Sequence, residues 1–460
     1  MNIWQLLRSA VRGDTYDYTK GSLRKAIVLL AIPMMLEMAM ESIFALVDAY
    51  FVGRLGVAAL TTVGLTEVML TLIYSLGVGL SVAPMALIAR FVGEQRPELA
   101  SRAAGQSIVL TLLISLAIAV PAYLYSADLL SLMGAGPAVV REGVGYTRIL
   151  FAGNGIIMLL FLLNGIFRGA GEAATAMRVL WIANGINIVL DPLLIFGLGP
   201  LPGFGVEGAA IATTIGRGCG VAYQLYLLTT GRSLVKINGG RWAIDFGMQL
   251  RIIRIAGNGA FQYLIGSACW IFLARIVASF GAAAVAGYTV SIRLILFTLL
   301  PAWGLSNAAA TFVGQNLGAQ QADRAEAGVW WTLKITCVYL LLLSLAYYAL
   351  AGPLVESFTA DEAAAVYGIR ALRIFAIGYL FFGLALIPVQ AFNGAGDTLT
   401  PTVLNFVCLW LLGIPLGYYL AVNQGWEVSG VIWSSVAAEG VLSGLALWLF
   451  KRGSWKSKVI

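Results

Sequence analysis

The stretch NIVLDP (Asn187–Pro192) lies inside an apolar run that reaches from about Met177 to Leu198. Such a run can cross a bilayer as one helix, which takes about 20 residues. A carboxylate there costs roughly 2.5–3.5 kcal/mol on insertion, so an intramembrane acid generally has a function. Asn187 precedes Asp191 by one helical turn and shares its face, while Pro192 disfavours helical geometry at Asp191. The stretch predicts a membrane span with a functional acid; the alternative is a structural acid satisfied by Asn187 and freed backbone groups.

The composition of the whole chain is typical of a helical membrane protein. Of its 460 residues, 60% are hydrophobic and 11% are charged, whereas a soluble domain has about 25% charged residues. The apolar runs do not alternate with period two, as the strands of a membrane β-barrel do. We therefore predict an all-α polytopic membrane protein.

Basic residues gather in three short regions, at the N-terminus, in the middle of the chain and at the C-terminus. They are Arg8, Arg12, Lys20, Arg24 and Lys25, then Arg232, Lys236, Arg241, Arg251 and Arg254, then Lys451, Arg452, Lys456 and Lys458. The positive-inside rule places all three regions in the cytoplasm. This predicts an inner (plasma) membrane protein with both termini cytoplasmic. Because the clusters are short and flank membrane spans, they do not indicate a nucleic-acid partner.

The sequence lacks the residues that several kinds of catalytic and metal chemistry usually require. The sequence has no histidine, which is the commonest metal ligand and general base. The cysteines are far apart and lie in apolar runs, at Cys219, Cys269, Cys337 and Cys408. This placement is typical of packing residues rather than of a disulfide framework or a metal cluster. An intramembrane enzyme would need a nucleophile motif or a metal, so we expect no enzymatic activity and no cofactor.

The apolar runs predict twelve transmembrane helices, six in each half, after a short interfacial helix at about Ile3–Val11. An even number of spans agrees with two basic termini on one side. The predicted segments are a cytoplasmic N-terminal segment (1–25), an N-lobe with spans one to six (26–228), a cytoplasmic linker (229–254), a C-lobe with spans seven to twelve (255–450) and a cytoplasmic tail (451–460).

Four motifs recur in the two halves in the same order, at an offset near 222–225 residues. Phe91-Val92-Gly93-Glu94 matches Phe312-Val313-Gly314-Gln315, Arg168-Gly169-Ala170-Gly171-Glu172 matches Asn393-Gly394-Ala395-Gly396-Asp397, Gly56 with Ala58-Ala59-Leu60 matches Gly281 with Ala283-Ala284-Val285, and Val206 with Gly208 matches Val428 with Gly430. This pattern indicates an internal duplication. Because each half has six spans, the copies share one orientation and are related by an axis along the membrane normal. A substrate site is expected between or within the two lobes.

The first span carries three acids on one face. Glu37, Glu41 and Asp48 lie within roughly 40° of each other around the helix, so this face meets a neighbouring helix or a wet cavity rather than lipid. At least one of Glu37 and Glu41 is expected to border the substrate cavity, and Glu67 of the second span is a further candidate. Alternatively, Glu37 is solvated near the membrane surface and Asp48 pairs with Arg54.

The two halves differ in their acids. Asp191-Pro192 corresponds to Ile414-Pro415, so the C-terminal half keeps the proline and lacks the acid. The seventh span, which matches the first, has no carboxylate. Acid chemistry is therefore expected mainly in the N-terminal half, and Glu439 of the twelfth span stays open between a structural and a functional role.

Together, these motifs resemble those of multidrug and toxic compound extrusion (MATE) transporters over nearly the whole chain. The resemblance rests on Ile32-Pro33, on VDAYFVGRLG (Val47–Gly56), on the turns Gly169–Gly171 and Gly394–Asp397, and on Asp191-Pro192. It implies two six-helix lobes arranged as a V, which export organic cations by inward flow of H⁺ or Na⁺. The partners would be small organic substrates and membrane lipid, and we expect the protein to work as a monomer.

The chain is similar to the DinF-like branch of this family, which keeps its essential acids in the N-lobe. The NorM-like branch has an acid in the seventh span, and this sequence has none there. The resemblance implies a site for H⁺ or Na⁺ at Asp48, Asn187 and Asp191. A hydroxyl from the sixth span completes it, from Thr213 or Thr214. No other metal is expected.

An alternative from the same superfamily is a flippase for lipid-linked saccharides, which needs a cationic cavity for pyrophosphate. Arg217, Arg275 and Arg293 lie in or near predicted spans and leave this alternative open. Otherwise, these arginines snorkel to the membrane surface or pair with acids.

Overall fold

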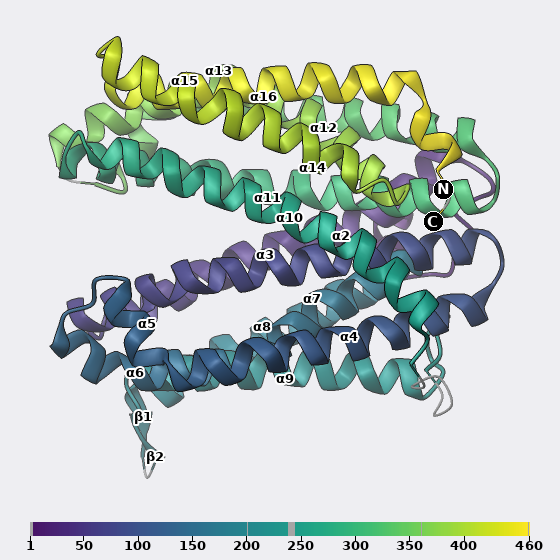
Figure 1. Cartoon of the computed structure of the whole chain (residues 1–460), viewed down its shortest axis with the longest axis horizontal. Helices are drawn as coiled ribbons and strands as arrows, with labels where there is room; N and C mark the ends of the chain where they lie inside the picture. Colours follow the sequence, from purple (N-terminus) through teal and green to yellow (C-terminus); the bar gives the residue numbers. More distant parts are fainter. Residues whose placement is uncertain (1–2, 200, 238–243, 360, 459) are drawn as a thin grey trace.

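The computed structural model describes residues 3–199, 201–237, 244–359, 361–458 and 460. The described part is built almost entirely of helices (Figure 1). The first half contains α1 (Ile3–Arg12), α2 (Leu23–Gly53), α3 (Val57–Gly93), α4 (Pro97–Leu124), α5 (Ser126–Leu132), α6 (Pro137–Ala152), α7 (Asn154–Gly169), α8 (Ala173–Phe196) and α9 (Val206–Thr229). Between α8 and α9, β1 (Gly197–Leu198) pairs antiparallel with β2 (Leu201–Pro202).

The second half repeats the pattern of long helices. It contains α10 (Phe246–Ala278), α11 (Ala282–Gly318), α12 (Ala322–Glu356), α13 (Glu362–Gly394), α14 (Leu399–Asn405), α15 (Ile414–Tyr418) and α16 (Glu427–Arg452). A π-helical stretch, Phe406–Gly413, joins α14 to α15, and a second one, Tyr419–Asn423, continues this span after α15. A 3₁₀ turn follows α16 at Ser454–Ser457.

Each of the predicted spans corresponds to a helix. Among the described residues, ten helices are long and apolar enough to cross a membrane, and the pair α6–α7, bent by 41°, makes an eleventh. The remaining span is α9, whose 24 residues are long enough but include Glu207, Thr213, Thr214 and Arg217. The predicted all-α polytopic membrane fold is therefore confirmed, with one span that is unusually polar.

The start of α10 differs from the sequence-based expectation. It begins at Phe246, because the side chain of Asp245 caps it by accepting from the backbone nitrogens of Gly247 and Met248 at 3.1 and 3.3 Å; aspartate is a favoured N-cap residue. The first turns of α10 thus lie in the predicted linker, and Arg241 of that linker falls outside the described residues. Pro192 lies inside α8, which runs on to Phe196, close to the expected end of this span.

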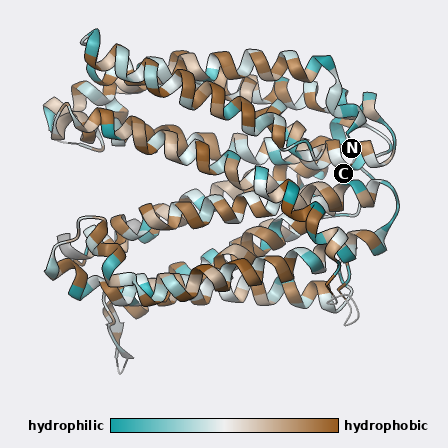
Figure 2. Ribbon diagram, in the orientation of Figure 1, coloured by the Kyte–Doolittle hydropathy of each residue, from teal (hydrophilic) through white to brown (hydrophobic). Residues whose placement is uncertain are grey.

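The helices form two bundles, α2–α9 and α10–α16, that meet at the end holding both chain termini and diverge toward the other end (Figure 1). Hydrophobic residues cover the length of the helices, and hydrophilic residues gather toward their ends (Figure 2). The V shape matches the predicted two-lobe arrangement. We call the bundles the N-lobe and the C-lobe.

Glycine residues of the repeated motifs lie where backbones approach closely. A Cβ atom at Gly93 on α3 would overlap the carbonyl oxygen of Gln315 on α11, and one at Gly314 on α11 would lie 2.6 Å from the Cβ of Ala89 on α3. Only residues without a side chain allow helices to cross at this distance. The FVG motifs therefore recur in both halves because each forms part of the contact between the lobes.

The terminal segments bind across both lobes at the closed end. Tyr18 donates to the carbonyl of Gly171 at 3.2 Å in the N-lobe, and its own carbonyl accepts from Asn316 of α11 at 3.4 Å. At the other terminus, Lys458 forms an ion pair with Asp397 of the C-lobe at 3.0 Å, while its carbonyl accepts from Arg90 of the N-lobe. These contacts hold the lobes together at one end only.

Candidate functional site

A buried polar site lies between α8 and α9 in the N-lobe. The Asn187 amide donates to Thr213 Oγ1 at 3.1 Å and to Asp191 Oδ1 at 3.5 Å. Asn187 is 2% exposed and Asp191 is 0% exposed. The other two acceptors of this pair, Asn187 Oδ1 and Asp191 Oδ2, have no hydrogen-bond partner within the described residues. Buried polar atoms are rarely left unpartnered, so these two oxygens distinguish the site from ordinary packed polar groups.

Close packing of α9 against α8 positions the hydroxyl group. A Cβ atom at Gly216 would lie 2.7 Å from the carbonyl oxygen of Ala183 and 3.0 Å from the Cβ of Asn187. The glycine therefore lets α9 approach α8 until Thr213 reaches Asn187. Thr214 instead donates to the carbonyl of Ala210 in its own helix at 2.8 Å. Of the two threonines left open by the sequence, only Thr213 contacts the polar site.

Asp48 brings a second carboxylate from α2. It is half-buried and lies close enough to Asp191 and to Arg217 to interact electrostatically with both. Arg54 does not neutralise it, because Arg54 donates to the hydroxyl of Tyr50 and stacks over that ring at 4.6 Å. The structure thus gathers all three residues expected to bind the coupling ion.

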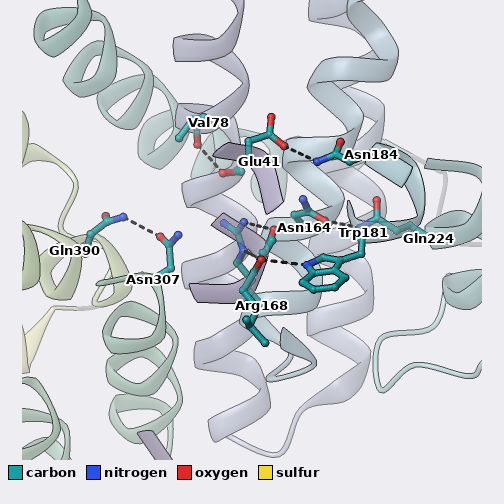
Figure 3. Close-up of polar contacts among 12 residues, drawn as sticks. Glu41, Val78, Asn164, Arg168, Trp181, Asn184, Gln224, Asn307 and Gln390 are labelled. Atoms are coloured by element: carbon teal, nitrogen blue, oxygen red, sulfur yellow. Dashed lines mark hydrogen bonds and ion pairs between the residues drawn. The ribbon is translucent and has the colours of Figure 1, made fainter. Parts of the chain in front are cut away.

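Glu41 lies on the same face of α2 and contacts two polar partners. Asn184 of α8 donates to Glu41 Oε2 at 3.2 Å, as Figure 3 shows, and Arg217 Nη2 lies 3.6 Å from Glu41 Oε1. Arg217 also donates to the hydroxyl of Tyr74 at 3.3 Å, and its guanidinium lies 5.5 Å from the ring of Phe44. The Glu41 side chain stays 30% exposed. The expected pairing of Arg217 with an acid is confirmed. That acid is Glu41, whose side chain solvent and solutes can reach.

Glu37 occupies a different environment. Arg168 of α7 donates from Nε to Glu37 Oε2 at 3.3 Å and from Nη2 to Oε1 at 2.5 Å, and the Glu37 side chain is 0% exposed. The guanidinium of Arg168 points into the packed helices in Figure 3. The structure therefore separates Glu37 from solvent, and does not bring it together with Glu41 at a cavity. Sequence reasoning did not find this pair, although Arg168 is the one charged residue in its turn motif without a charged counterpart in the other half.

Glu67 of α3 is exposed and stands between the lobes. It lies within electrostatic range of Asp48 in its own lobe and of Arg293 on α11 in the other. Arg275 and Arg293 are both exposed, unlike Arg217. Glu67 therefore lies where the two lobes face each other.

The oxygens of the polar site suit a small hard cation. Within the part of the chain that the structure describes, no group of three or more His, Cys, Asp or Glu side chains is arranged to hold a metal ion. The site instead combines carboxylate, amide and hydroxyl oxygens, which bind hard cations rather than transition metals. Protonation of a carboxylate is the other way to satisfy the two free acceptors.

Comparison with known proteins agrees with this architecture. The MatE family model matches residues 33–193 and, a second time, residues 259–419. The chain is 27% identical over 97% of its length to the probable multidrug resistance protein YoeA of Bacillus subtilis (strain 168), of which it covers 97%. It is 25% identical over 95% of its length to the probable multidrug resistance protein NorM of Thermotoga maritima, of which it covers 94%.

A solved structure has the same fold. The chain superimposes with a TM-score of 0.89 and 27% identity on a multidrug resistance MATE family transporter of the MOP superfamily in its outward-facing conformation, with 99% of this chain and 98% of that chain covered. The double match of the family model also confirms the internal duplication. The fold, the paired matches and the relatives over the full length agree: the chain belongs to the MatE family of membrane transporters and is not an enzyme.

Proposed function

We propose that this protein exports amphipathic, mostly cationic organic compounds, coupled to inward movement of H⁺ or Na⁺ that binds at Asp48, Asn187 and Asp191. The observation that carries the proposal is the pair of buried oxygens without partners, Asn187 Oδ1 and Asp191 Oδ2. A cation or a proton bound there removes the cost of leaving them unsatisfied, which is about 1–3 kcal/mol per group. Thr213 fixes the orientation of the Asn187 amide, so that its oxygen faces the site.

The charge of the site can bias the arrangement of the helices. With no cation bound, ionised Asp48 on α2 and Asp191 on α8 repel each other. Binding of H⁺ or Na⁺ removes this repulsion and lets the two helices approach. Such a local change moves a two-state equilibrium only if the ion binds one state more tightly than the other. Separation of the carboxylates in the second state would supply this difference in affinity.

Two acids outside the ion site are placed to select substrates. Glu41 is partly exposed beside Asp48, and Glu67 is exposed between the lobes. Their negative charges would attract organic cations and disfavour anions. The relatives named as multidrug resistance proteins support small organic compounds as the cargo of this chain.

We infer that the protein belongs to the DinF-like branch and lies in the inner membrane as a monomer with both termini cytoplasmic. The branch is supported by the carboxylates on α2 and α8, together with the absence of any acid between 259 and 278 in the sequence of α10. The orientation is supported by the basic termini, which lie together at the end where the lobes meet (Figure 1). In this orientation the structure is open to the outside, as in the solved outward-facing relative.

A flippase for lipid-linked saccharides has less support. It would need free cationic side chains for a pyrophosphate. Arg217 is 6% exposed and already pairs with Glu41. Of the three arginines that left this alternative open, only Arg275 and Arg293 on the C-lobe are exposed.

Transport in proteoliposomes tests the coupling site. Purified protein is reconstituted, and export of a cationic dye is followed under a pH gradient and, separately, under a Na⁺ gradient. Wild-type protein should respond to at least one gradient. Asp191→Asn should remain folded and bind the dye but lose gradient-driven transport, whereas Glu142→Gln, at an exposed carboxylate of α6, should transport normally. Wild-type rates in Asp191→Asn under both gradients would place the coupling site elsewhere.

A further inference from the structure

The C-lobe contains a cavity of its own, away from the ion site. Its volume is about 270 Å³, and it lies among α10, α11, α13, α14 and α16. Aromatic residues form much of its wall, including Tyr263, Trp270, Trp303 and Phe382. A single carboxylate, that of Glu439 on α16, faces this apolar space. Pockets for small molecules are typically apolar with a few placed polar groups, so the cavity has the composition of a binding site.

Two polar groups in the cavity lack partners. Glu439 has no basic residue within ion-pair distance in the described part of the chain. Gln262, which is 4% exposed, has a buried side-chain oxygen with no hydrogen-bond partner among the described residues. An unpaired carboxylate inside a membrane protein is costly and generally functional. The two groups together call for a ligand that carries a positive charge and a hydrogen-bond donor.

The internal duplication shows what corresponds to this cavity in the N-lobe. Gly430 on α16 packs against the backbone of the preceding span, as Gly208 on α9 does. Glu439 lies nine residues after Gly430, and Arg217 lies nine residues after Gly208. The unpaired carboxylate of the C-lobe therefore occupies the position that the buried guanidinium of Arg217 has in the N-lobe.

The same comparison fixes the register of the first and second spans of each half. A Cβ at Gly304 of α11 would lie 2.6 Å from the carbonyl oxygen of Met34 on α2. Gly79 of α3, the equivalent of Gly304, makes the same kind of approach to Gly259 on α10, with a Cβ at 2.8 Å from its carbonyl carbon. Met34 thus corresponds to Gly259. The sequence offset between these two residues is the same as that between Gly79 and Gly304, so it relates both the first and the second span of each half.

In that register, smaller side chains replace the residues that surround Arg217. Its partners Glu41, Phe44 and Tyr74 correspond to Gly266, Cys269 and Leu299. Gly266 and Leu299 line the cavity, and Cys269 lines its continuation beside Glu439. The C-lobe thus lacks one carboxylate and two aromatic rings that fill the corresponding volume in the N-lobe, and this volume stays open as the cavity. Because Glu439 stands in the place of Arg217, the charge at this position is reversed.

We propose that the C-lobe cavity is a second binding site, specific for a monovalent organic ammonium ion with an aromatic group, and that Glu439 is its counter-ion. The ammonium of the ligand takes the place that the guanidinium of Arg217 takes in the N-lobe. The rings of Trp270 and Phe382 pack against the aromatic part of the ligand, and an N–H donor of the ligand reaches Gln262. Cation–π contacts with such walls strengthen ammonium binding when water is excluded. This site goes beyond the proposed function, since it requires neither the coupling ion nor transport.

Equilibrium dialysis of radiolabelled tryptamine, which is a monovalent ammonium at neutral pH, tests the proposal with full-length protein in detergent. Wild-type protein should bind one tryptamine saturably, and tryptophol, its neutral hydroxyl analogue, should compete poorly. Glu439→Gln should weaken binding by at least about tenfold, the factor that 1.4 kcal/mol represents. Gly266→Leu should abolish it, because a Cβ at Gly266 meets only open space and a larger side chain would fill the cavity.

Matched variants separate this site from the ion site and from misfolding. Gly257→Leu places the same side chain on the same helix at an exposed position with open space, and should bind as the wild type does. Asp191→Asn should also bind normally, although it loses coupled transport if the N-lobe proposal holds. The proposal is overturned if wild type shows no saturable binding, if Glu439→Gln or Gly266→Leu binds with wild-type affinity, or if Asp191→Asn loses binding. Elution of each variant as a single size-exclusion peak establishes that it is folded.

Discussion

Glu37 of α2 and Arg168 of α7 form a bidentate ion pair whose side chains are 0% and 11% exposed. The two residues are separated by 131 positions in the sequence and join two helices of the N-lobe. Removing one partner of a buried pair leaves the other charge uncompensated, which costs about 3–5 kcal/mol. The relationship therefore concerns stability rather than substrate binding.

We predict that Glu37→Gln lowers the thermal stability of the purified protein, because Arg168 is left buried without its counter-ion. Arg168→Gln should lower it similarly. The double variant Glu37→Gln/Arg168→Gln should recover a large part of the loss, since neither charge then remains. Melting midpoints from thermal unfolding in detergent measure the effect. A double variant whose loss equals the sum of the two single losses would contradict the assignment of an ion pair.

We predict that Glu41→Gln changes substrate selection more than stability. Its carboxylate is 30% exposed and balances the charge of Arg217. Without it, the guanidinium would carry an unbalanced positive charge beside the exposed position of residue 41 and would repel cationic compounds. Efflux of a cationic dye should therefore fall more than efflux of a neutral one, measured in cells at matched expression. An equal loss for both dyes would indicate a role in folding or gating instead.

Much of the fold could be predicted because its signals are local or repeated. Apolar runs of bilayer length predict spans wherever they occur, and the recurring glycine motifs revealed the duplication. Gly171 and Gly396 illustrate why these motifs occur in both halves: they have positive φ angles, of 84° and 82°, in equivalent turns. Only glycine adopts that conformation without steric cost. The first turns of α10 were not predicted, because the capping residue Asp245 lies in a polar stretch that resembles a linker.

The pairing of charges could not be predicted in the same way. Asp191 and Asn187 share one helix face, so their contact follows from spacing alone. The partners of Glu37 and Glu41 come from other helices, and their identity depends on how those helices rotate when they pack. The equivalence of Arg217 and Glu439 was available from the Val206 and Val428 motifs, although the vacant volume beside Glu439 depends on the surrounding side chains.

A third prediction concerns two glycines of α3 with opposite surroundings. A Cβ at Gly79 would overlap the backbone of Ala260 on α10, where the lobes cross, whereas a Cβ at Gly64 meets nothing within 4 Å. Gly79→Ala should force α10 away from α3 and lower both the melting temperature and the transport rate. Gly64→Ala should be neutral or stabilising by up to about 1 kcal/mol, because alanine favours the helix. Equal melting midpoints for the two variants would argue against close contact of α3 and α10.

The last prediction separates two adjacent threonines of α9. Thr213 accepts the hydrogen bond of Asn187 at 3.1 Å, whereas Thr214 donates to its own helix at Ala210. Valine has nearly the shape of threonine and lacks the hydroxyl. In Thr213→Val the Asn187 amide loses an acceptor and can turn, so its oxygen no longer faces the ion site.

Gradient-driven transport by Thr213→Val should therefore need a higher concentration of the coupling ion, by roughly tenfold if the lost hydrogen bond contributes about 1.4 kcal/mol to ion binding. The dependence of transport rate on external pH and on external Na⁺, measured in proteoliposomes, gives this shift and identifies the ion that is affected. Thr214→Val should retain the wild-type dependence, because its hydroxyl contacts only the backbone of α9. If both variants shift equally, the effect comes from the packing of α9 rather than from the hydroxyl of Thr213, and the ion site does not include that residue.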